Sequence, residues 1–277
     1  MLQWGGEALH CNFVFFRIMS GLSEWAIGFA LGLLSGVISG LVGIGGGTII
    51  IPLLVLIMGY TQHVAQGTAL LAFALPVFGW AAWNYYKHGR VDGHLALGVA
   101  GGIAVSSFFV ARWVQEMRSE LLTQVFAVFL IVVSVWQFWR AGRSFSFPSA
   151  GEGQKKGALY KVMWGLIIGL AAGALKGLTG LGGGVIIVPL LVLLVKVDQH
   201  MAQGTSLLTM TLPVSFMAVI PYWQKGNVMV GVAFALALGI LVGSAISSRI
   251  AQRIAGPHLA RLFAITIFGI GVFLLYS

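Results

Sequence analysis

The feature that most constrains this chain is a glycine-interrupted apolar segment that occurs twice, 137 residues apart. The sequence GLVGIGGGTIIIPLLVL at 40–56 returns as GLTGLGGGVIIVPLLVL at 177–193. Across the wider windows 36–68 and 173–205, 20 of 33 positions are identical without a gap. A duplicated apolar segment broken by glycines is typical of a membrane transporter built from two related halves.

The composition excludes a soluble protein. The chain is 58% hydrophobic and only 8% charged, whereas soluble domains carry about 25% charged residues. The net charge of +9 comes mainly from basic residues between apolar runs, which favours cytoplasmic loops over nucleic-acid binding. The single cysteine, Cys11, excludes an internal disulfide. The carboxylates all lie outside the apolar runs: Glu7, Glu24, Asp92, Glu116, Glu120, Glu152 and Asp198.

Ten apolar runs, five in each half, predict an all-α polytopic membrane protein. The runs cover 22–42, 47–58, 64–86, 93–114, 121–139, 160–181, 184–195, 201–223, 228–248 and 258–276. We expect an N-terminal extension at 1–21, a first membrane repeat at 22–140, a basic linker at 141–159 and a second membrane repeat at 160–277. The run after each glycine tract is short of the about 20 residues that a span needs. The prediction is therefore about 8–10 crossings, with short or re-entrant helices after the glycine breaks.

The distribution of basic residues favours an odd number of crossings in each half. If all ten runs cross and the N-terminus is outside, eleven basic residues lie in the cytoplasm and four lie outside. If the first two runs of each half form one crossing, the best split is nine to six. The positive-inside rule favours the first arrangement, in which the two repeats are inverted about the membrane plane.

Glycines at every fourth position predict close helix packing. Residues spaced by four share one helix face, and small residues there allow two backbones to approach in a membrane. We expect them to hold the first helix of each half against a neighbour, such as the other half. They are Gly28, Gly32, Gly36 and Gly40, and Gly165, Gly169, Gly173 and Gly177.

The crowded glycines at 43–47 and 180–184 indicate a different role. Each glycine costs about 1 kcal/mol in a helix relative to alanine, so continuous helix is disfavoured there. Unwound backbone at membrane depth must face protein or water. The helix that restarts after each tract directs free N–H groups at that space, and such a terminus suits an anion. The alternative is a tight turn between two helices.

The polar element QHxAQGT begins the third run of each half, at 62–68 and 199–205. Its amides and hydroxyls can donate hydrogen bonds to an oxyanion without adding negative charge. Helix capping is the alternative role. His63 and His200 adjoin loops, and they are the candidates for proton coupling because imidazole titrates near neutral pH. Pro76 and Pro213 follow at matched positions and predict a kink in each helix.

Lys176 interrupts an apolar run four residues before Gly180, and its counterpart in the first half is Ser39. A lysine inside a membrane is costly unless it faces a cavity or a partner. No acidic residue is close in sequence, so an anionic substrate could neutralise it. The alternative is a lysine near a helix end that extends to the membrane surface.

Motifs for enzymatic chemistry are absent from the sequence. It contains no HExxH, no GxSxG and no GxxxxGK[ST], and the glycine tract does not follow a predicted strand. We therefore expect no enzymatic activity, no cofactor, no metal site and no nucleic-acid partner. Because the apolar runs hold no carboxylate, an anion carrier fits better than a cation carrier.

The repeated GLxGxGGGxxxxPLL motif, followed by A-x-G-T and then Ser206 or Ala69, resembles the TauE/SafE family. That family is also known as the sulfite exporter or 4-toluene sulfonate uptake permease family. The resemblance covers roughly residues 25–275, and it departs from the family pattern at Ala69 and Lys176. It implies transport of sulfite or organosulfur anions across the bacterial inner membrane, with no direction specified.

The sequence therefore predicts a multi-pass secondary transporter for a small sulfur-containing anion: sulfite, thiosulfate or an organosulfonate. A coupling H+ or Na+ and a homo-oligomer are compatible with it. An anion channel and a non-transporting membrane scaffold remain alternatives. The expected substrate-binding residues are Gly45, Gly46, Gly47, Thr48, Gln66, Thr68, Lys176, Gly182, Gly183, Gly184, Gln203, Thr205 and Ser206.

Overall fold

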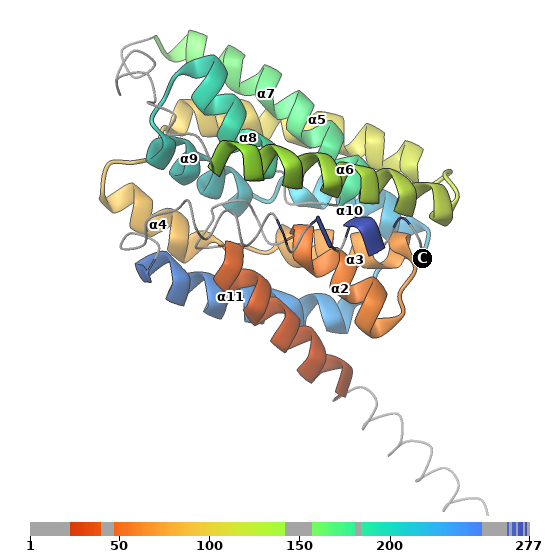
Figure 1. Cartoon of the computed structure of the whole chain (residues 1–277). Helices are drawn as coiled ribbons and strands as arrows, with labels where there is room; N and C mark the ends of the chain where they lie inside the picture. Colours follow the sequence, from red (N-terminus) through yellow and green to blue (C-terminus); the bar gives the residue numbers. More distant parts are fainter. Residues whose placement is uncertain are drawn as a thin grey trace, which may run out of the picture.

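The computed structural model of the protein describes residues 23–39, 47–141, 157–180 and 184–250, with scattered positions between 265 and 275. Over these residues the chain is helical and contains no β-strand, which confirms the predicted all-α class. Figure 1 shows the long helices α5 and α7 lying alongside each other. The predicted extension at 1–21 lies outside the described residues.

The first half contains a Ser23–Ser39 helix followed by five labelled helices. These are α2 (Gly47–Met58), α3 (Gln62–Ala74), α4 (Gly79–Lys87), α5 (Gly93–Val114) and α6 (Ser119–Ala141). The second half contains α7 (Ala158–Thr179), α8 (Gly184–Leu190) with the π-helical turn η1 (Leu191–Val195), α9 (Gln199–Thr211), α10 (Ser215–Gln224) and α11 (Val230–Ile250).

The spacing of 137 residues also relates the helices of the two halves. Adding 137 to the bounds of α2 gives 184–195, the range that α8 and η1 cover together. The same shift of α3 gives the bounds of α9. The same shift brings α5 to within one residue of the bounds of α11. The correspondence in secondary structure thus extends beyond the windows in which the sequence identity is high.

Four of the described helices are long and apolar enough to cross a membrane, namely α5, α6, α7 and α11. The number rises to six if α3 with α4, and α9 with α10, each form one bent span. Other apolar segments, such as α2, form shorter helices. Glycine and proline breaks shorten several helices, so the described residues contain four to six candidate spans by length and composition. The predicted run 258–276 lies largely outside the described residues, and the expected 8–10 crossings stay a prediction.

Both bent spans are broken at the predicted prolines. The axis turns by 45° between α3 and α4, where Pro76 lies, and by 43° between α9 and α10, where Pro213 lies. Proline lacks the N–H that continues a helix, and its ring clashes with the carbonyl of the preceding turn. The apolar run predicted at 64–86 therefore consists of two helices, α3 and α4.

Every described glycine of the four-residue spacing packs against the other half, which confirms their predicted packing role. A Cβ atom at Gly32 would lie 2.3 Å from the carbonyl oxygen of Leu236 in α11. A Cβ atom at the equivalent Gly169 would lie 2.3 Å from the carbonyl oxygen of Val99 in α5. The Ser23–Ser39 helix thus pairs with α11, and α7 pairs with α5. Gly40 lies outside the described residues.

The halves also exchange equivalent hydrogen bonds. Thr68 Oγ1 accepts from the backbone N–H of Met229 at 3.0 Å. The equivalent Thr205 Oγ1 accepts from the backbone N–H of Asp92, also at 3.0 Å. A self-complementary contact of this kind is what an approximate two-fold relation between two similar units produces.

Candidate functional site

Lys176 lies where the two bent spans meet. Its side chain is 1% exposed, and Nζ donates a hydrogen bond to Ser215 Oγ at 2.6 Å. Ser215, the first residue of α10, donates in turn to the carbonyl oxygen of Phe73 at 3.1 Å. Phe73 belongs to the last turn of α3, so the breaks of both spans and α7 contribute to one polar contact.

The proline break explains why the Phe73 carbonyl is available. In a continuous helix that oxygen would accept from the backbone N–H of Val77, four residues later. Here the Val77 N–H bonds to the Leu75 carbonyl at 2.7 Å, because α3 ends before Pro76. An unpaired carbonyl in the membrane interior is costly, and the Ser215 hydroxyl satisfies it.

Lys176 has no carboxylate partner within the described part of the chain. The ion pairs recorded there join Arg118 to Glu120 and Lys161 to Asp92. A buried ammonium group without a counter-charge is costly, and a single hydroxyl replaces only part of its hydration. The site is therefore chemically suited to an anion, which would bring the missing charge.

Gln66 connects the first half to the glycine break of the second. Its Nε2 donates to the carbonyl oxygen of Leu178 at 3.3 Å, and its Oε1 accepts from the Tyr222 hydroxyl at 2.7 Å. Tyr222 also approaches the Gly177 carbonyl at 3.4 Å. Gly180 ends α7 in the left-handed conformation, with φ of 71°, and a Cβ there would lie 2.8 Å from Gln66 Cβ.

The equivalent contact in the other half is looser. Gln203 Oε1 accepts from the Tyr85 hydroxyl at 3.3 Å, compared with 2.7 Å for Gln66 and Tyr222. The lysine is unmatched as well, since Ser39 corresponds to Lys176 and Phe78 corresponds to Ser215. The charged centre therefore belongs to one of the two equivalent positions only.

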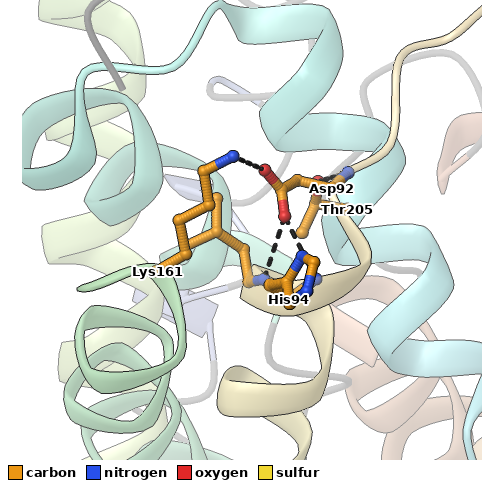
Figure 2. A network of polar contacts seen from close by, with 5 residues as sticks. Asp92, His94, Lys161 and Thr205 are labelled. Atoms are coloured by element: carbon orange, nitrogen blue, oxygen red, sulfur yellow. Dashed lines mark hydrogen bonds and ion pairs between the residues drawn. The ribbon is translucent and has the colours of Figure 1, made fainter. Parts of the chain in front are cut away.

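The hydroxyls of Thr68 and Thr205 serve the contact between the halves. Each accepts from the backbone at the start of a long helix, as described above. Figure 2 shows the Thr205 side of this contact, where Asp92 Oδ1 caps α5 by accepting from His94 N and Leu95 N. Asp92 Oδ2 pairs with Lys161 Nζ at 2.8 Å. The predicted roles of Thr68 and Thr205 in anion binding thus compete with a structural role.

The Asp92–Lys161 ion pair is expected to stabilise the contact between α5 and α7. Both side chains are largely buried, at 8% and 13% exposed. Lys161→Met leaves Asp92 Oδ2 without its cation, so we expect a loss of about 1–3 kcal/mol, between values for exposed and fully buried pairs. The measurement is thermal unfolding of the purified protein in detergent.

The exposed pair Arg118–Glu120, at 3.6 Å, provides the control for that prediction. Arg118→Met is expected to leave the unfolding temperature unchanged, because solvent screens an exposed pair. Adding Asp92→Asn to Lys161→Met should recover part of the loss, since asparagine keeps an N-cap and removes the unpaired charge. Equal effects of Lys161→Met and Arg118→Met would contradict the assignment.

The remaining predicted site residues are dispersed. Gly47 and Thr48 begin α2, and Thr48 Oγ1 is buried without a hydrogen-bond partner among the described residues. Gly184 begins α8, and Ser206 is buried in α9. The other predicted glycines lie outside the described residues: Gly45, Gly46, Gly182 and Gly183.

Neither histidine lies at the Lys176 contact. A ring nitrogen of half-buried His63 is 3.0 Å from the carbonyl oxygen of Met117, between α5 and α6. His200 is exposed near the start of α9. The proton-coupling role that the sequence suggested for these two histidines stays a prediction.

Two residues of this region were not among the sequence predictions, Ser215 and Tyr222. Ser215 could have been noticed because it follows Pro213 closely and stands where the first half has Phe78. Tyr222 gave a weaker signal, because its equivalent Tyr85 shares the residue type and tyrosine is common near membrane surfaces. Both signals become interpretable only when the two halves are placed together.

Comparison with known proteins agrees with a transporter architecture. Residues 28–274 match the family described as Sulfite exporter TauE/SafE. The "Probable membrane transporter protein YunE" of Bacillus subtilis is 27% identical over 89% of this chain and 96% of its own length. YdhB, a probable membrane transporter protein of the same organism, is 28% identical over 76% of this chain and 82% of its own. The "Probable membrane transporter protein MJ0441" of Methanocaldococcus jannaschii is 25% identical, with 88% and 93% covered.

The family match covers most of the chain and includes both glycine-interrupted segments. Together with several apolar spans, it identifies a multi-pass membrane protein of a transporter family. The chain belongs to the sulfite exporter TauE/SafE family.

Proposed function

We propose that this protein is a secondary transporter that moves a small sulfur-containing anion, such as sulfite, thiosulfate or an organosulfonate. The observation that carries the proposal is Lys176, a buried lysine whose amino group bonds to a hydroxyl and has no carboxylate partner among the described residues. The family description, which names sulfite export, supports the substrate class.

In this mechanism the ammonium group of Lys176 attracts the anion, and Ser215 holds that group at the breaks of the two bent spans. Charge-assisted hydrogen bonds are roughly twice as strong as neutral ones, so the lysine supplies most of the attraction. Gln66 would contact the anion only at the periphery of the site, because its amide nitrogen already donates to the Leu178 carbonyl at the end of α7. Thr48 of α2 offers a buried hydroxyl that has no hydrogen-bond partner within the described part of the chain.

We further propose that the two halves are inverted, and contacts between helices support this. Thr68, in the middle of α3, accepts from Met229, directly before α11. Further along both segments, the Val77 carbonyl just beyond α3 accepts from Ser244 of α11, so α3 runs parallel to α11. The Ser23–Ser39 helix also runs parallel to α11, since Gly28 meets Val232 and Gly36 meets Ile240.

The second half runs the opposite way. Gln66 meets Tyr222 and Phe73 meets Ser215, so α3 and α10 are antiparallel. Helix α9 continues into α10 with a bend of 43°. Helix α9 also runs parallel to α5, because Thr205 contacts Asp92 and, four residues later in both helices, Thr209 contacts Ala96. Because α7 is parallel to α5, α7 points opposite to its equivalent, the Ser23–Ser39 helix. This arrangement suits alternating access around a central site.

The test is anion flux in proteoliposomes that contain the purified full-length protein. We expect saturable uptake of sulfite or an organosulfonate, and counterflow when the vesicles are preloaded with the same anion. Protein-free vesicles are the control, and imposed H+ or Na+ gradients identify the coupling ion. Flux without saturation or counterflow would favour an anion channel, and absence of flux for all tested anions would favour a scaffold.

A further inference from the structure

Helix α4 carries an exposed aromatic face that the proposed transport site does not use. Trp80, Trp83 and Tyr86 follow one another at intervals of three residues, and they are 55%, 54% and 62% exposed. The rings of Trp83 and Tyr86 stack with centroids 5.8 Å apart. Indole and phenol rings with apolar and polar edges are characteristic of the membrane–water interface.

A shallow pocket of about 160 Å³ lies on this face, lined by Trp80, Trp83, Asn84 and Lys87. Lys87 Nζ is 5.5 Å from the centroid of the Trp83 ring, which holds the ammonium group at the pocket by a cation–π contact. Among the described residues no carboxylate forms an ion pair with Lys87. The pocket therefore combines an aromatic wall, an amide and a cation that lacks an acidic partner.

The pocket lies at the end of the protein that the basic residues assign to the cytoplasm. Lys87 ends α4, and Arg90 follows in the short connection to α5. Asp92, at the start of α5, forms an ion pair with Lys161, near the start of α7. The basic linker comes directly before α7, so it meets α7 at the same end of the protein. By the positive-inside rule this end faces the cytoplasm, where the leaflet is rich in anionic lipids.

The equivalent face of α10 lacks this combination. Met217, Ile220 and Trp223 stand in place of Trp80, Trp83 and Tyr86, while Pro221 and Gln224 replace Asn84 and Lys87. The repeat architecture therefore does not require the aromatic and basic residues of α4. The equivalent face of α10 does not carry this combination, as expected of a feature that recognises the lipids of one leaflet.

We propose that this pocket binds the headgroup of an anionic phospholipid of the cytoplasmic leaflet. The Lys87 ammonium and the Asn84 amide would bind the phosphate oxygens, and the Trp80 and Trp83 rings would pack against the glycerol and upper acyl chains. An acyl chain provides the apolar contact that exposed indole rings require, so a lipid fits this surface better than free phosphate.

The test is native mass spectrometry of the purified full-length protein titrated with phosphatidylglycerol or phosphatidylcholine. We expect tighter binding of the first phosphatidylglycerol than of phosphatidylcholine. Lys87→Gln, which introduces the residue found at the equivalent position of α10, should weaken phosphatidylglycerol binding about fivefold. Trp83→Ala should weaken binding of both lipids, because the aromatic wall is lost.

Lys225→Gln is the matched control, since it removes one exposed cation after α10 at the opposite end of the protein. It should change phosphatidylglycerol affinity less than twofold. Equal affinities of the Lys87→Gln and Lys225→Gln variants would overturn the proposal. So would displacement of the phospholipid by inorganic phosphate at an equal concentration, because that result would assign the pocket to a free anion. Neither outcome depends on which anion the protein transports.

Discussion

Replacing Lys176 by alanine is expected to lower the apparent affinity for the transported anion by about 10- to 100-fold, the range for a lost charge-assisted hydrogen bond. The ammonium group is the buried cation at the contact between the two bent spans, and its nearest partner is the Ser215 hydroxyl. Without it, an anion entering the site would lose its hydration and gain no opposite charge. Initial rates of sulfite uptake into proteoliposomes, measured over a range of concentrations, provide the readout.

Two further variants separate charge from position. Lys176→Arg keeps the charge but places a larger, planar head group at a position that is 1% exposed, so we expect weak residual transport that remains saturable. Ser215→Ala keeps the cation but removes its hydroxyl partner and leaves the Phe73 carbonyl unsatisfied. We expect a loss for Ser215→Ala that is smaller than for Lys176→Ala. Unchanged saturation with a folded Lys176→Ala variant would refute the central role of the lysine.

The scaffold of this protein could be predicted from the sequence because its determinants are local and repeated. Glycines at every fourth position mark a helix face, and Gly32 and Gly169 do pack against backbone of the other half. Pro76 and Pro213 mark the bends for a similarly local reason. Each of these signals can be read within a short window of the chain.

The partners of the site residues could not be predicted, since they come from distant positions. Gln66 bonds to Leu178, 112 residues away, and Phe73 bonds to Ser215, 142 residues away. The sequence repeat indicated one midplane site between the two halves, where both glycine breaks meet, but it did not pair individual residues across that site. In the structure Gln66 of the first half lies against Gly180 of the second. The residues of one half that contact a given residue of the other half are determined by how the helix pairs pack, and no local sequence pattern encodes that packing.

The threonines illustrate a second reason for the difference. A hydroxyl at a conspicuous position can bind a substrate or complete the protein's own hydrogen bonds, and the residue type is the same in both cases. Thr68 and Thr205 were predicted to bind the anion, yet each accepts a backbone N–H from the other half. Only the position of the partner distinguishes the two roles.

The neighbouring glycines Gly101 and Gly102 of α5 are expected to respond very differently to substitution by alanine. A Cβ atom at Gly102 would lie 2.4 Å from the carbonyl oxygen of Leu166 and 2.5 Å from the backbone nitrogen of Leu170. Both atoms are backbone of α7, so the clash can be relieved only by moving one helix. We expect Gly102→Ala to destabilise the protein by about 3 kcal/mol or more, at the upper end of overpacking effects.

Gly101 provides the control one position away on the same helix. A Cβ atom there would meet nothing nearer than the Leu166 Cδ1 atom at 3.8 Å, an ordinary contact. Because alanine favours helix over glycine by about 1 kcal/mol, Gly101→Ala should be neutral or stabilising. Fluorescence-detected size exclusion and thermal unfolding in detergent measure the difference, and similar behaviour of the two variants would contradict close packing of α5 on α7.

The same reasoning predicts a third variant through the relation between the halves. Gly239 of α11 is the equivalent of Gly102, and a Cβ atom there would lie 2.3 Å from the carbonyl oxygen of Phe29 in the Ser23–Ser39 helix. Gly239→Ala is therefore expected to destabilise the protein as much as Gly102→Ala does. Because each helix pair joins one helix from each half, a matched loss would show that the two halves depend equally on this exchange. A loss confined to Gly102→Ala would mean that only the α5–α7 pair is essential for folding.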